Sequence, residues 1–420
     1  MCVKKLILST LRPLAFVVVV AASITSVMAL TSSAVFAADK PKISQKVGKP
    51  LQEAQQLIAQ KKFKEALDKV NETSSISGKT AQEEKIINEL KAYCFQQMKD
   101  YASQAKVYEA MLAANQIPAN EVPEKIEFLA KINFQIKDYP KAIQYGERYI
   151  KESGANTEIT DMVARAYYLK GDFKTAGEMI QKLIKQAEQA KRVPEKSWYE
   201  LLMSTQFKLD NKSGIVTTLE ALLNHYPTQE YWGNMFKYLI NEASYSEREI
   251  IEVLRLKKAL GILDAKEYID LAELSLAMTD PGNAKAALEA GISAGVLGQA
   301  KDKERETRLL NLAKTKAAQD LASLDVSAKE AQTLPKGDAL AKIGTAYLGH
   351  GLNDKAAAAL KAGIAKGGVN SIDEAYIRLG VANLNTNKKA EAIKAFQSVS
   401  DKSNLARLSR LWIIYAQNKK

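Results

Sequence analysis

The chain has 420 residues, of which 46% are hydrophobic and 26% are charged, so its composition is that of a globular protein and not of a disordered one. Its 21 glycines and 10 prolines are below average usage, which argues for long helices and against an all-β protein. With two cysteines and two histidines, a disulfide scaffold is excluded and a Cys/His zinc site is disfavoured. The formal net charge of +12 points to a nucleic acid or an acidic membrane as partner, unless the charge lies outside the folded body.

The first 37 residues have the layout of a secretory signal peptide. Lys4, Lys5 and Arg12 precede a largely apolar run at 14–30, and small residues follow it up to Ala37. We therefore expect cleavage after Ala37 and export to the periplasm of a bacterium. An uncleaved membrane anchor is the alternative, because the apolar run is almost long enough to span a bilayer.

A short pattern recurs along the rest of the chain. An aromatic residue or a proline opens an apolar helix with a small residue near its start, as in KKFKEALDKV at 61–70, KDYPKAIQYG at 137–146 and NKKAEAIKAF at 387–396. A preceding helix carries a second small residue, such as Ala164 or Gly380. Such a helix pair cannot bury its apolar face alone, so neighbouring pairs are expected to stack.

This spacing resembles the tetratricopeptide repeat, a helix–turn–helix unit of 34 residues. The clearest copies lie at 157–190 and 373–406. The resemblance implies an all-α fold, a right-handed α-solenoid of about ten such repeats closed by a C-terminal capping helix.

The repeats divide the sequence into segments. The predicted layout is a signal peptide at 1–37, a basic tail at 38–46, repeats one to five at 47–228, degenerate repeats at 229–336 flanking a clear repeat that begins at 265, further repeats at 337–404, and a capping helix with a basic tail at 405–420. Degenerate repeats near 229 and near 300 are inferred because the spacing between clear copies doubles there.

The sequence carries no recognisable catalytic constellation. It lacks a Walker loop, a G-x-S-x-G elbow and an H-E-x-x-H helix, and His225 and His350 fall in predicted helix ends or turns several repeats apart. Cys94 lies on an apolar helical stretch and is expected to be a buried, unreactive thiol. We therefore expect no enzyme activity, no cofactor and no metal.

The resemblance implies a concave surface lined by the first helix of each repeat. The candidate partner-binding residues carried over to this surface are Tyr93, Gln96, Lys131, Phe134, Arg165, Tyr168, Tyr199 and Met203. Aromatic, Arg and Met side chains among amides are typical of peptide-binding surfaces. Glu89, Glu127 and Asp161 stand where chaperone-binding members carry the lysine of a carboxylate clamp, which disfavours that ligand. Packing between repeats is the alternative role for these side chains.

Together these features indicate a non-catalytic scaffold or adaptor of the cell envelope that binds a protein or peptide through its concave surface. The layout is also similar to exported repeat proteins that accompany TonB-type energy-transduction systems. A subunit of an envelope enzyme and a solenoid that binds a small ligand or a glycan are the alternatives.

The positive charge lies mainly outside the repeats. Residues 1–37 carry a net charge of +3, residues 38–50 another +3 and residues 401–420 +4, which leaves +2 for residues 51–400. A nucleic acid is therefore not expected as a partner, because its recognition needs a basic stripe on the folded surface. The basic ends allow at most weak contact with anionic lipid head groups.

Overall fold

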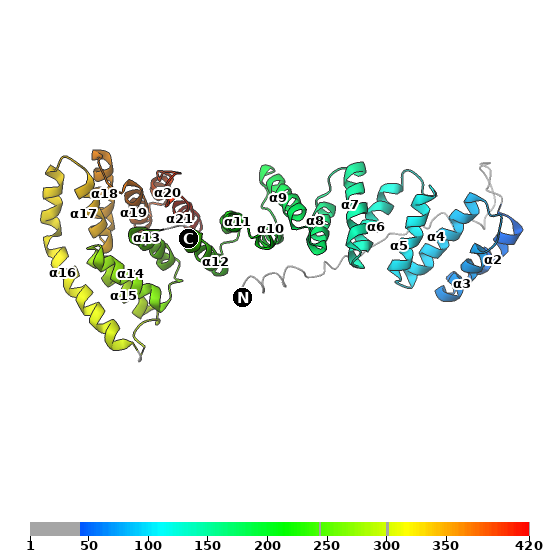
Figure 1. The fold of residues 1–420 in the computed structure, drawn as a ribbon, viewed down its shortest axis with the longest axis horizontal. Helices are drawn as coiled ribbons and strands as arrows, with labels where there is room; N and C mark the ends of the chain where they lie inside the picture. The colour runs from blue at the N-terminus through cyan, green and yellow to red at the C-terminus, as the bar shows by residue number, and fades with distance from the viewer. Residues whose placement is uncertain (1–42, 243–244, 300–301, 420) are drawn as a thin grey trace. The chain divides into compact units, whose positions relative to one another are not determined.

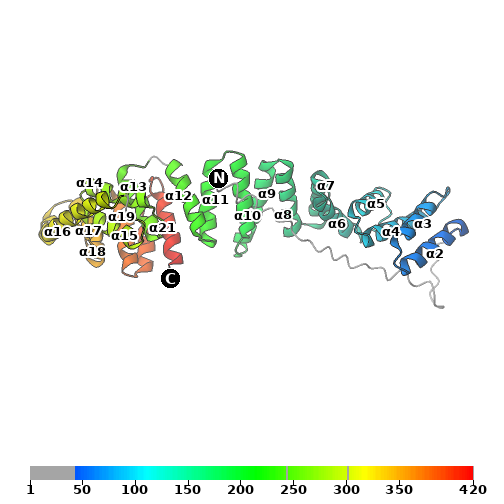
Figure 2. The same cartoon turned by 90° about the horizontal axis from the view of Figure 1, so that it is seen from below.

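The computed structural model describes residues 43–242, 245–299 and 302–419, and these residues form twenty α-helices and no β-strand (Figures 1 and 2). This confirms the all-α prediction. The predicted signal peptide and most of the basic tail at 38–46 lie outside the described residues. Among the described helices, none combines the length and the apolar character needed to cross a membrane.

The chain divides into two compact units, residues 1–211 and residues 212–420. The sequence predicted a block of five repeats ending at 228. The division instead falls at Asn211, inside the fifth predicted repeat, in the turn between its two helices.

The first unit is a row of helical hairpins joined by short turns (Figure 1). Its helices are α2 (Gln45–Ala59), α3 (Phe63–Ser74), α4 (Ala81–Gln97), α5 (Tyr101–Ala113), α6 (Val122–Gln135), α7 (Tyr139–Ser153), α8 (Thr157–Lys170), α9 (Phe173–Gln189) and α10 (Lys196–Lys208). They pack mainly on the next helix in the chain, and α6 and α8 also contact the first helix of the following hairpin. This is the nearest-neighbour packing expected of stacked repeats.

Three of the turns inside the hairpins share one local design. A residue with a positive φ angle ends the first helix, and the next residue, an aspartate, caps the second helix, at Lys99–Asp100, Lys137–Asp138 and Gly171–Asp172. In each case the aspartate side chain accepts a hydrogen bond from the backbone N–H three residues later, at 3.1–3.3 Å. The left-handed residue closes one helix and the aspartate satisfies a free N–H of the next, so the chain reverses within three residues.

Small residues let the hairpins approach closely, as the repeat pattern predicts. Ala130 and Ala164 are completely buried. A Cβ atom added to Gly146 of α7 would lie 2.3 Å from Cγ2 of Val163 in α8, so only glycine fits there without displacing a neighbour. The thiol of Cys94 is also completely buried in this unit.

The second unit contains α11 (Lys212–His225), α12 (Gln229–Glu242), α13 (Glu247–Ala259), α14 (Ala265–Ala277), α15 (Pro281–Ser293), α16 (Lys303–Thr333), α17 (Asp338–Gly349), α18 (Asn353–Lys366), α19 (Ile372–Asn385), α20 (Lys389–Gln397) and α21 (Ala406–Asn418). In this unit, helices far apart in sequence also pack together. α13 contacts α19, α15 contacts α17, and α11 contacts α21. The second unit therefore closes on itself.

The predicted helix–turn–helix near residue 300 is wrong. The structure has a single helix of 31 residues, α16. Its sequence contains no glycine or proline and is rich in Ala, Lys, Glu and Leu, so nothing in it favours a turn. Its buried residues form a narrow stripe: Glu306, Ala313, Ala317, Leu324 and Ala331. A helix with one narrow buried stripe lies at the edge of a unit.

The capping helix α21 packs on α20 and also on α11. Trp412 is stacked on Phe396 of α20, with ring centroids 5.6 Å apart. Arg407 and Arg410 form ion pairs with Glu220 of α11, the former at 3.4 Å. The hydroxyl of Tyr415 donates a hydrogen bond of 3.1 Å to the carbonyl oxygen of Ala259 at the end of α13. The last helix thus joins the two ends of the second unit.

Candidate functional site

Two of the candidate concave-surface residues are core residues. Tyr199 is 1% exposed, and its hydroxyl donates a hydrogen bond of 3.2 Å to Glu188 of α9. Tyr168 is 8% exposed, and its ring meets that of Phe173 edge-to-face at 5.2 Å. Both rings fill the space between helices, which corrects the prediction that they are available to a partner.

Lys131 and Arg165 connect the first helices of consecutive hairpins. Lys131 of α6 lies 2.7 Å from Glu127 of its own helix and 2.9 Å from Glu158 of α8. Although burial opposes its charge, hydrogen bonds to both carboxylates raise the pKa of Lys131. Arg165 of α8 pairs with Asp161 at 2.8 Å and donates a hydrogen bond of 3.3 Å to Ser197 of α10. These two side chains therefore brace the hairpins against one another.

The other four candidate residues, Tyr93, Gln96, Phe134 and Met203, are half-buried. Tyr93 meets Phe63 edge-to-face at 6.3 Å, and Phe134 meets Tyr139 at 5.9 Å. Each aromatic residue thus has one supported face and leaves part of its surface accessible to a partner. These four residues remain candidates for binding.

Three exposed apolar side chains flank α10, and none of them is among the predicted candidates. Val193 precedes the helix and is 62% exposed, whereas Phe207 and Leu209 lie at its other end and are 44% and 50% exposed. Side chains at opposite ends of a helix do not form one patch, and exposed apolar residues scattered in this way are normal on a protein surface.

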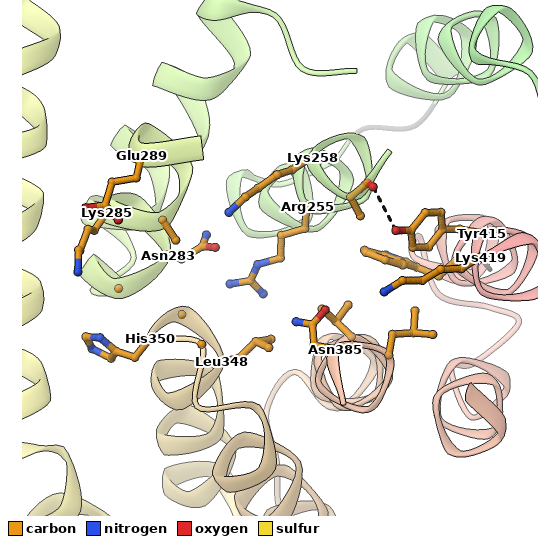
Figure 3. A pocket seen from close by; sticks show the side chains of 18 residues that line it. Arg255, Lys258, Asn283, Lys285, Glu289, Leu348, His350, Asn385, Tyr415 and Lys419 are labelled. Atoms are coloured by element: carbon orange, nitrogen blue, oxygen red, sulfur yellow. Dashed lines mark hydrogen bonds between the residues drawn. The ribbon is translucent and has the colours of Figure 1, made fainter. Parts of the chain in front are cut away.

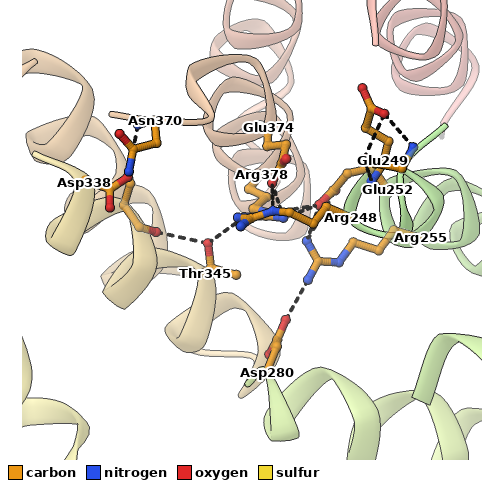
Figure 4. A network of polar contacts seen from close by, with 12 residues as sticks. Arg248, Glu249, Glu252, Arg255, Asp280, Asp338, Thr345, Asn370, Glu374 and Arg378 are labelled. Carbon is orange, nitrogen blue, oxygen red and sulfur yellow. Dashed lines mark hydrogen bonds and ion pairs between the residues drawn. The ribbon is translucent and has the colours of Figure 1, made fainter. Parts of the chain in front are cut away.

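The second unit contains a buried network of charged residues that the sequence did not predict (Figure 4). Seven consecutive residues of α13, from Ile251 to Lys257, are buried, because α14 and α19 both pack against this helix. Glu252 is completely buried. It accepts a hydrogen bond of 2.8 Å from Nε of Arg378 in α19 and one of 3.2 Å from Nη1 of Arg255.

The network extends on both sides of Glu252. Arg255 also lies 2.8 Å from Asp280, and Arg378 lies 2.9 Å from Glu374 and 3.2 Å from the hydroxyl of Thr345. Arg248 approaches Glu374 at 3.3 Å, so three arginines face three carboxylates. Buried charges need this balance, since an unpaired one is costly.

The pKa values of two buried carboxylates of the network, Glu252 and Asp280, shift in opposite directions. Burial opposes the charge on Glu252, but the combined attraction of Arg255 and Arg378 outweighs it and lowers the pKa of Glu252. For Asp280, burial dominates over the attraction of Arg255 and raises the pKa. Asp280 also caps α15, in the same turn design as in the first unit, where it follows Thr279 with its positive φ.

Next to this network is a cavity of about 430 Å³, lined by the ends of α13, α15, α17, α19 and α21 (Figure 3). Its charged and amide lining residues are Arg255, Lys258, Lys285, Lys419, Asn283 and Asn385, and one carboxylate, Glu289, also lines it. Its apolar wall consists of Leu348, Val381, Leu384, Trp412 and the ring of Tyr415. The volume is in the range of small-molecule sites.

Lys258 is the least solvated of the cavity lysines. Burial, with the nearby charge of Arg255, lowers the pKa of Lys258 to about 8. His350, which the sequence placed in a turn, is the C-cap residue of α17, and its Nε2 lies 2.7 Å from Asp320 of α16. In the described part of the chain, no group of His, Cys, Asp and Glu is arranged to hold a metal ion.

Sequence reasoning missed both the network and the cavity. The available signal was the run of residues at 248–258, REIIEVLRLKK, where charged residues alternate with apolar ones on every face of a helix. Such a helix has no solvent face to which its charges can be assigned.

Comparisons with known proteins agree with the repeat assignment in the C-terminal part. Residues 342–404 match the family model of the tetratricopeptide repeat. None of the curated proteins matches the chain significantly.

Several solved structures are similar to this chain in fold and distant from it in sequence. They include the TPR2AB domain of yeast Sti1 in complex with pHSP90, with 13% identity, 71% of this chain and 100% of that chain covered, and a TM-score of 0.24. The C-terminal part of a TPR repeat-containing protein from Cytophaga hutchinsonii is 15% identical to this chain, with 82% of this chain and 98% of that chain covered, and its TM-score is 0.28. A tetratricopeptide repeat protein from Parabacteroides merdae is 12% identical, with 80% of this chain and 99% of that chain covered, and its TM-score is 0.29. The assignment therefore rests on the family match and the helical hairpins, and it shows that residues 342–404 are similar to tetratricopeptide repeats.

Proposed function

We propose that this protein is a non-catalytic scaffold of the bacterial periplasm, which binds a protein or peptide partner along the first helices of its N-terminal hairpins. The observation that supports it is a set of partly accessible residues on three of the first helices: Tyr93 and Gln96 on α4, Phe134 on α6 and Met203 on α10. An ion pair joins α6 to α8 and a hydrogen bond joins α8 to α10, so binding along these helices needs little further ordering.

The finer part of the proposal concerns location and pathway. The basic, apolar and small-residue segments of residues 1–37 support export, and the general layout supports a role as an accessory of a TonB-type energy-transduction system. Cell fractionation and N-terminal sequencing test the location. A mature protein that begins at Ala38 and is released with the periplasm is the expected result, and a cytoplasmic protein beginning at Met1 contradicts it.

Site-specific photo-crosslinking tests the binding surface. A photoreactive amino acid in place of Gln96 on α4 should crosslink a discrete partner in living cells. The same amino acid in place of Lys106, an exposed residue of α5, is the matched control and should not crosslink that partner. Equal crosslinking from both positions, or none from position 96, contradicts the proposed surface.

Side-chain truncation then measures the contribution of individual residues. We expect Tyr93→Ala combined with Met203→Ala to weaken binding to the crosslinked partner at least tenfold, since partly buried aromatic residues dominate such interfaces. Leu321→Ala combined with Val326→Ala removes exposed apolar side chains of α16 instead and should leave the affinity within twofold.

A further inference from the structure

We propose that the cavity of the second unit binds a small organic anion, a carboxylate or phosphate group attached to an apolar body such as an aromatic ring. The site lies wholly within residues 255–419 and uses none of the residues of the proposed partner-binding surface. It is therefore a binding activity in addition to the proposed scaffold function.

The first argument is the charge of the lining. Four cationic side chains line the cavity against the single carboxylate of Glu289, which has its own partner, Lys314, at 3.7 Å. Arg255 is neutralised by the buried network. In the part of the chain that the structure describes, Lys258, Lys285 and Lys419 have no carboxylate within ion-pair distance. The cavity thus has an excess of positive charge that a ligand anion would balance.

The second argument is a buried donor without an acceptor. Trp412 is 2% exposed and lines the cavity, and its indole Nε1 has no hydrogen-bond partner. Buried polar groups are nearly always hydrogen-bonded, so a donor without a partner in a residue of the cavity wall is unusual. Because this nitrogen is itself buried, a ligand oxygen atom reaches it only when the indole ring turns toward the cavity.

The third argument is the division of the lining into a polar and an apolar part. Figure 3 shows the nitrogen-bearing ends of Lys258, Arg255, Asn385 and Lys419 around one space. Leu348, Val381 and Leu384, with the rings of Trp412 and Tyr415, form the rest of the wall. A few convergent polar groups in an apolar cavity orient a ligand that has an anionic head and an apolar body.

Lys258 is the residue that such a ligand would affect most. Its ammonium group is largely removed from water and lies near the positive charge of Arg255, so its charge is poorly compensated when the cavity holds no anion. An anion bound beside it supplies the missing compensation. Lys285 is half-buried and Lys419 is exposed, and both contribute attraction to an anion.

The test is calorimetric titration of the full mature chain with three aromatic probes of similar shape, phenyl phosphate, phenylacetate and phenethylamine, and with inorganic phosphate, which lacks the ring. We expect one or both aromatic anions to bind, and to bind at least tenfold more tightly than phenethylamine and inorganic phosphate. Stronger binding of phenyl phosphate identifies a phosphate ester as the ligand class, and stronger binding of phenylacetate identifies a carboxylate. No binding of either aromatic anion at millimolar concentration overturns the proposal, as does equal binding of the amine.

Substitutions locate the site. Lys258→Met should weaken binding of the preferred anion at least tenfold, and Lys285→Met should weaken it several-fold. Lys361→Met removes an exposed lysine of α18 in the same unit and is the matched control, with an affinity expected within twofold. Equal losses in Lys258→Met and Lys361→Met overturn the assignment to this cavity.

A direct readout remains if Lys258→Met does not fold. In the wild-type chain, the indole N–H resonance that disappears in Trp412→Phe belongs to Trp412. It should move on addition of the anion, while the resonances of Trp198 and Trp232 stay unchanged. A shift confined to the other tryptophans contradicts the proposal. Because Trp412 and the crosslinking position Gln96 report on different sites, either proposal can fail alone.

Discussion

In the first unit the helices pack mainly on their neighbours in sequence, whereas in the second unit α13 packs on α19 and α11 on α21. Charged residues follow the same division. Lys131 and Glu158 form an ion pair between adjacent hairpins, and their side chains are 20% and 50% exposed. Glu252 and Arg378 form an ion pair across 126 residues of sequence, and their side chains are only 0% and 11% exposed. Similar helical hairpins thus produce an array held by local contacts in one case and a closed body in the other.

The difference indicates where each unit is sensitive to change. An array held by local contacts tolerates the loss of one surface pair, because each hairpin has its own core. A closed body with buried charges depends on each ion partner, because removal of one leaves another charge in the interior. The predictions below test this contrast.

The largest expected effect is that of Arg378→Met. It removes the partner of Glu252 at 2.8 Å and of Glu374 at 2.9 Å, and both carboxylates remain in the interior. We expect a loss of about 3–5 kcal/mol in the free energy of unfolding of the second unit, measured by urea denaturation. Adding Glu252→Gln should restore part of the loss. A loss of unfolding free energy no larger than that expected for an exposed ion pair contradicts the role assigned to the network.

The thiol of Cys94 reports on opening of the first unit. Burial raises the pKa of Cys94 to about 11. Because the folded-state pKa is raised, the thiolate is scarce at pH 8, about a hundredfold scarcer than for a free thiol with pKa 9. In a Cys2→Ser chain, a disulfide reagent should therefore react at least about a hundredfold more slowly before urea unfolding than after it. A fast reaction in Arg378→Met without urea shows that damage to the second unit spreads to the first.

Two glycines offer matched substitutions, one in each unit. A Cβ added to Gly380 would lie 2.3 Å from the ring of Phe396, and one added to Gly146 would lie 2.3 Å from Val163. We expect Gly380→Ala and Gly146→Ala each to cost about 1–3 kcal/mol. Gly380→Ala should also change the fluorescence of Trp412, which is stacked on Phe396, and Gly146→Ala should not. Equal changes in Trp412 emission contradict the independence of the two cores.

The smallest effect is expected for Lys131→Met. The side chain of Lys131 is 20% exposed and pairs with carboxylates on two adjacent first helices. The loss in stability of the first unit should be about 0.2–1 kcal/mol and should shrink in high salt, because such pairs are screened. If Lys131→Met lowers the unfolding free energy nearly as much as Arg378→Met, the two units do not differ in their sensitivity to loss of an ion pair.

Local sequence patterns predicted the elements that depend on local chemistry. The small residues at Ala164 and Gly380 and the capping helix after residue 405 follow from the repeat spacing. The aspartate caps of the turns were not predicted, although each aspartate directly precedes its helix in the sequence. The clearest part of the pattern, around Gly380 and Phe396, lies within the segment that matches the family model. The long helix α16 was missed because a doubled spacing was interpreted as a hidden repeat, although the sequence contains no turn residue there.

The candidate binding residues were predicted less well. Register along a repeat places Tyr168 and Tyr199 toward the concave side, but the neighbouring helices bury both rings. Periodicity defines which face of a helix a residue occupies, and it does not define how far the next hairpin covers that face. Half-buried residues such as Tyr93 and Phe134 kept their place as candidates because only one side of each ring is supported.

The sequence by itself determined the all-α class, the hairpin turns and the small-residue contacts, because these depend on residues within one repeat or in adjacent ones. The tertiary structure decided the closure of the second unit, its buried ion network and the cavity beside it. These features join α13 to α19 and α21, more than a hundred residues apart, and the charges of Glu252, Arg255 and Arg378 have meaning only once those helices remove them from water.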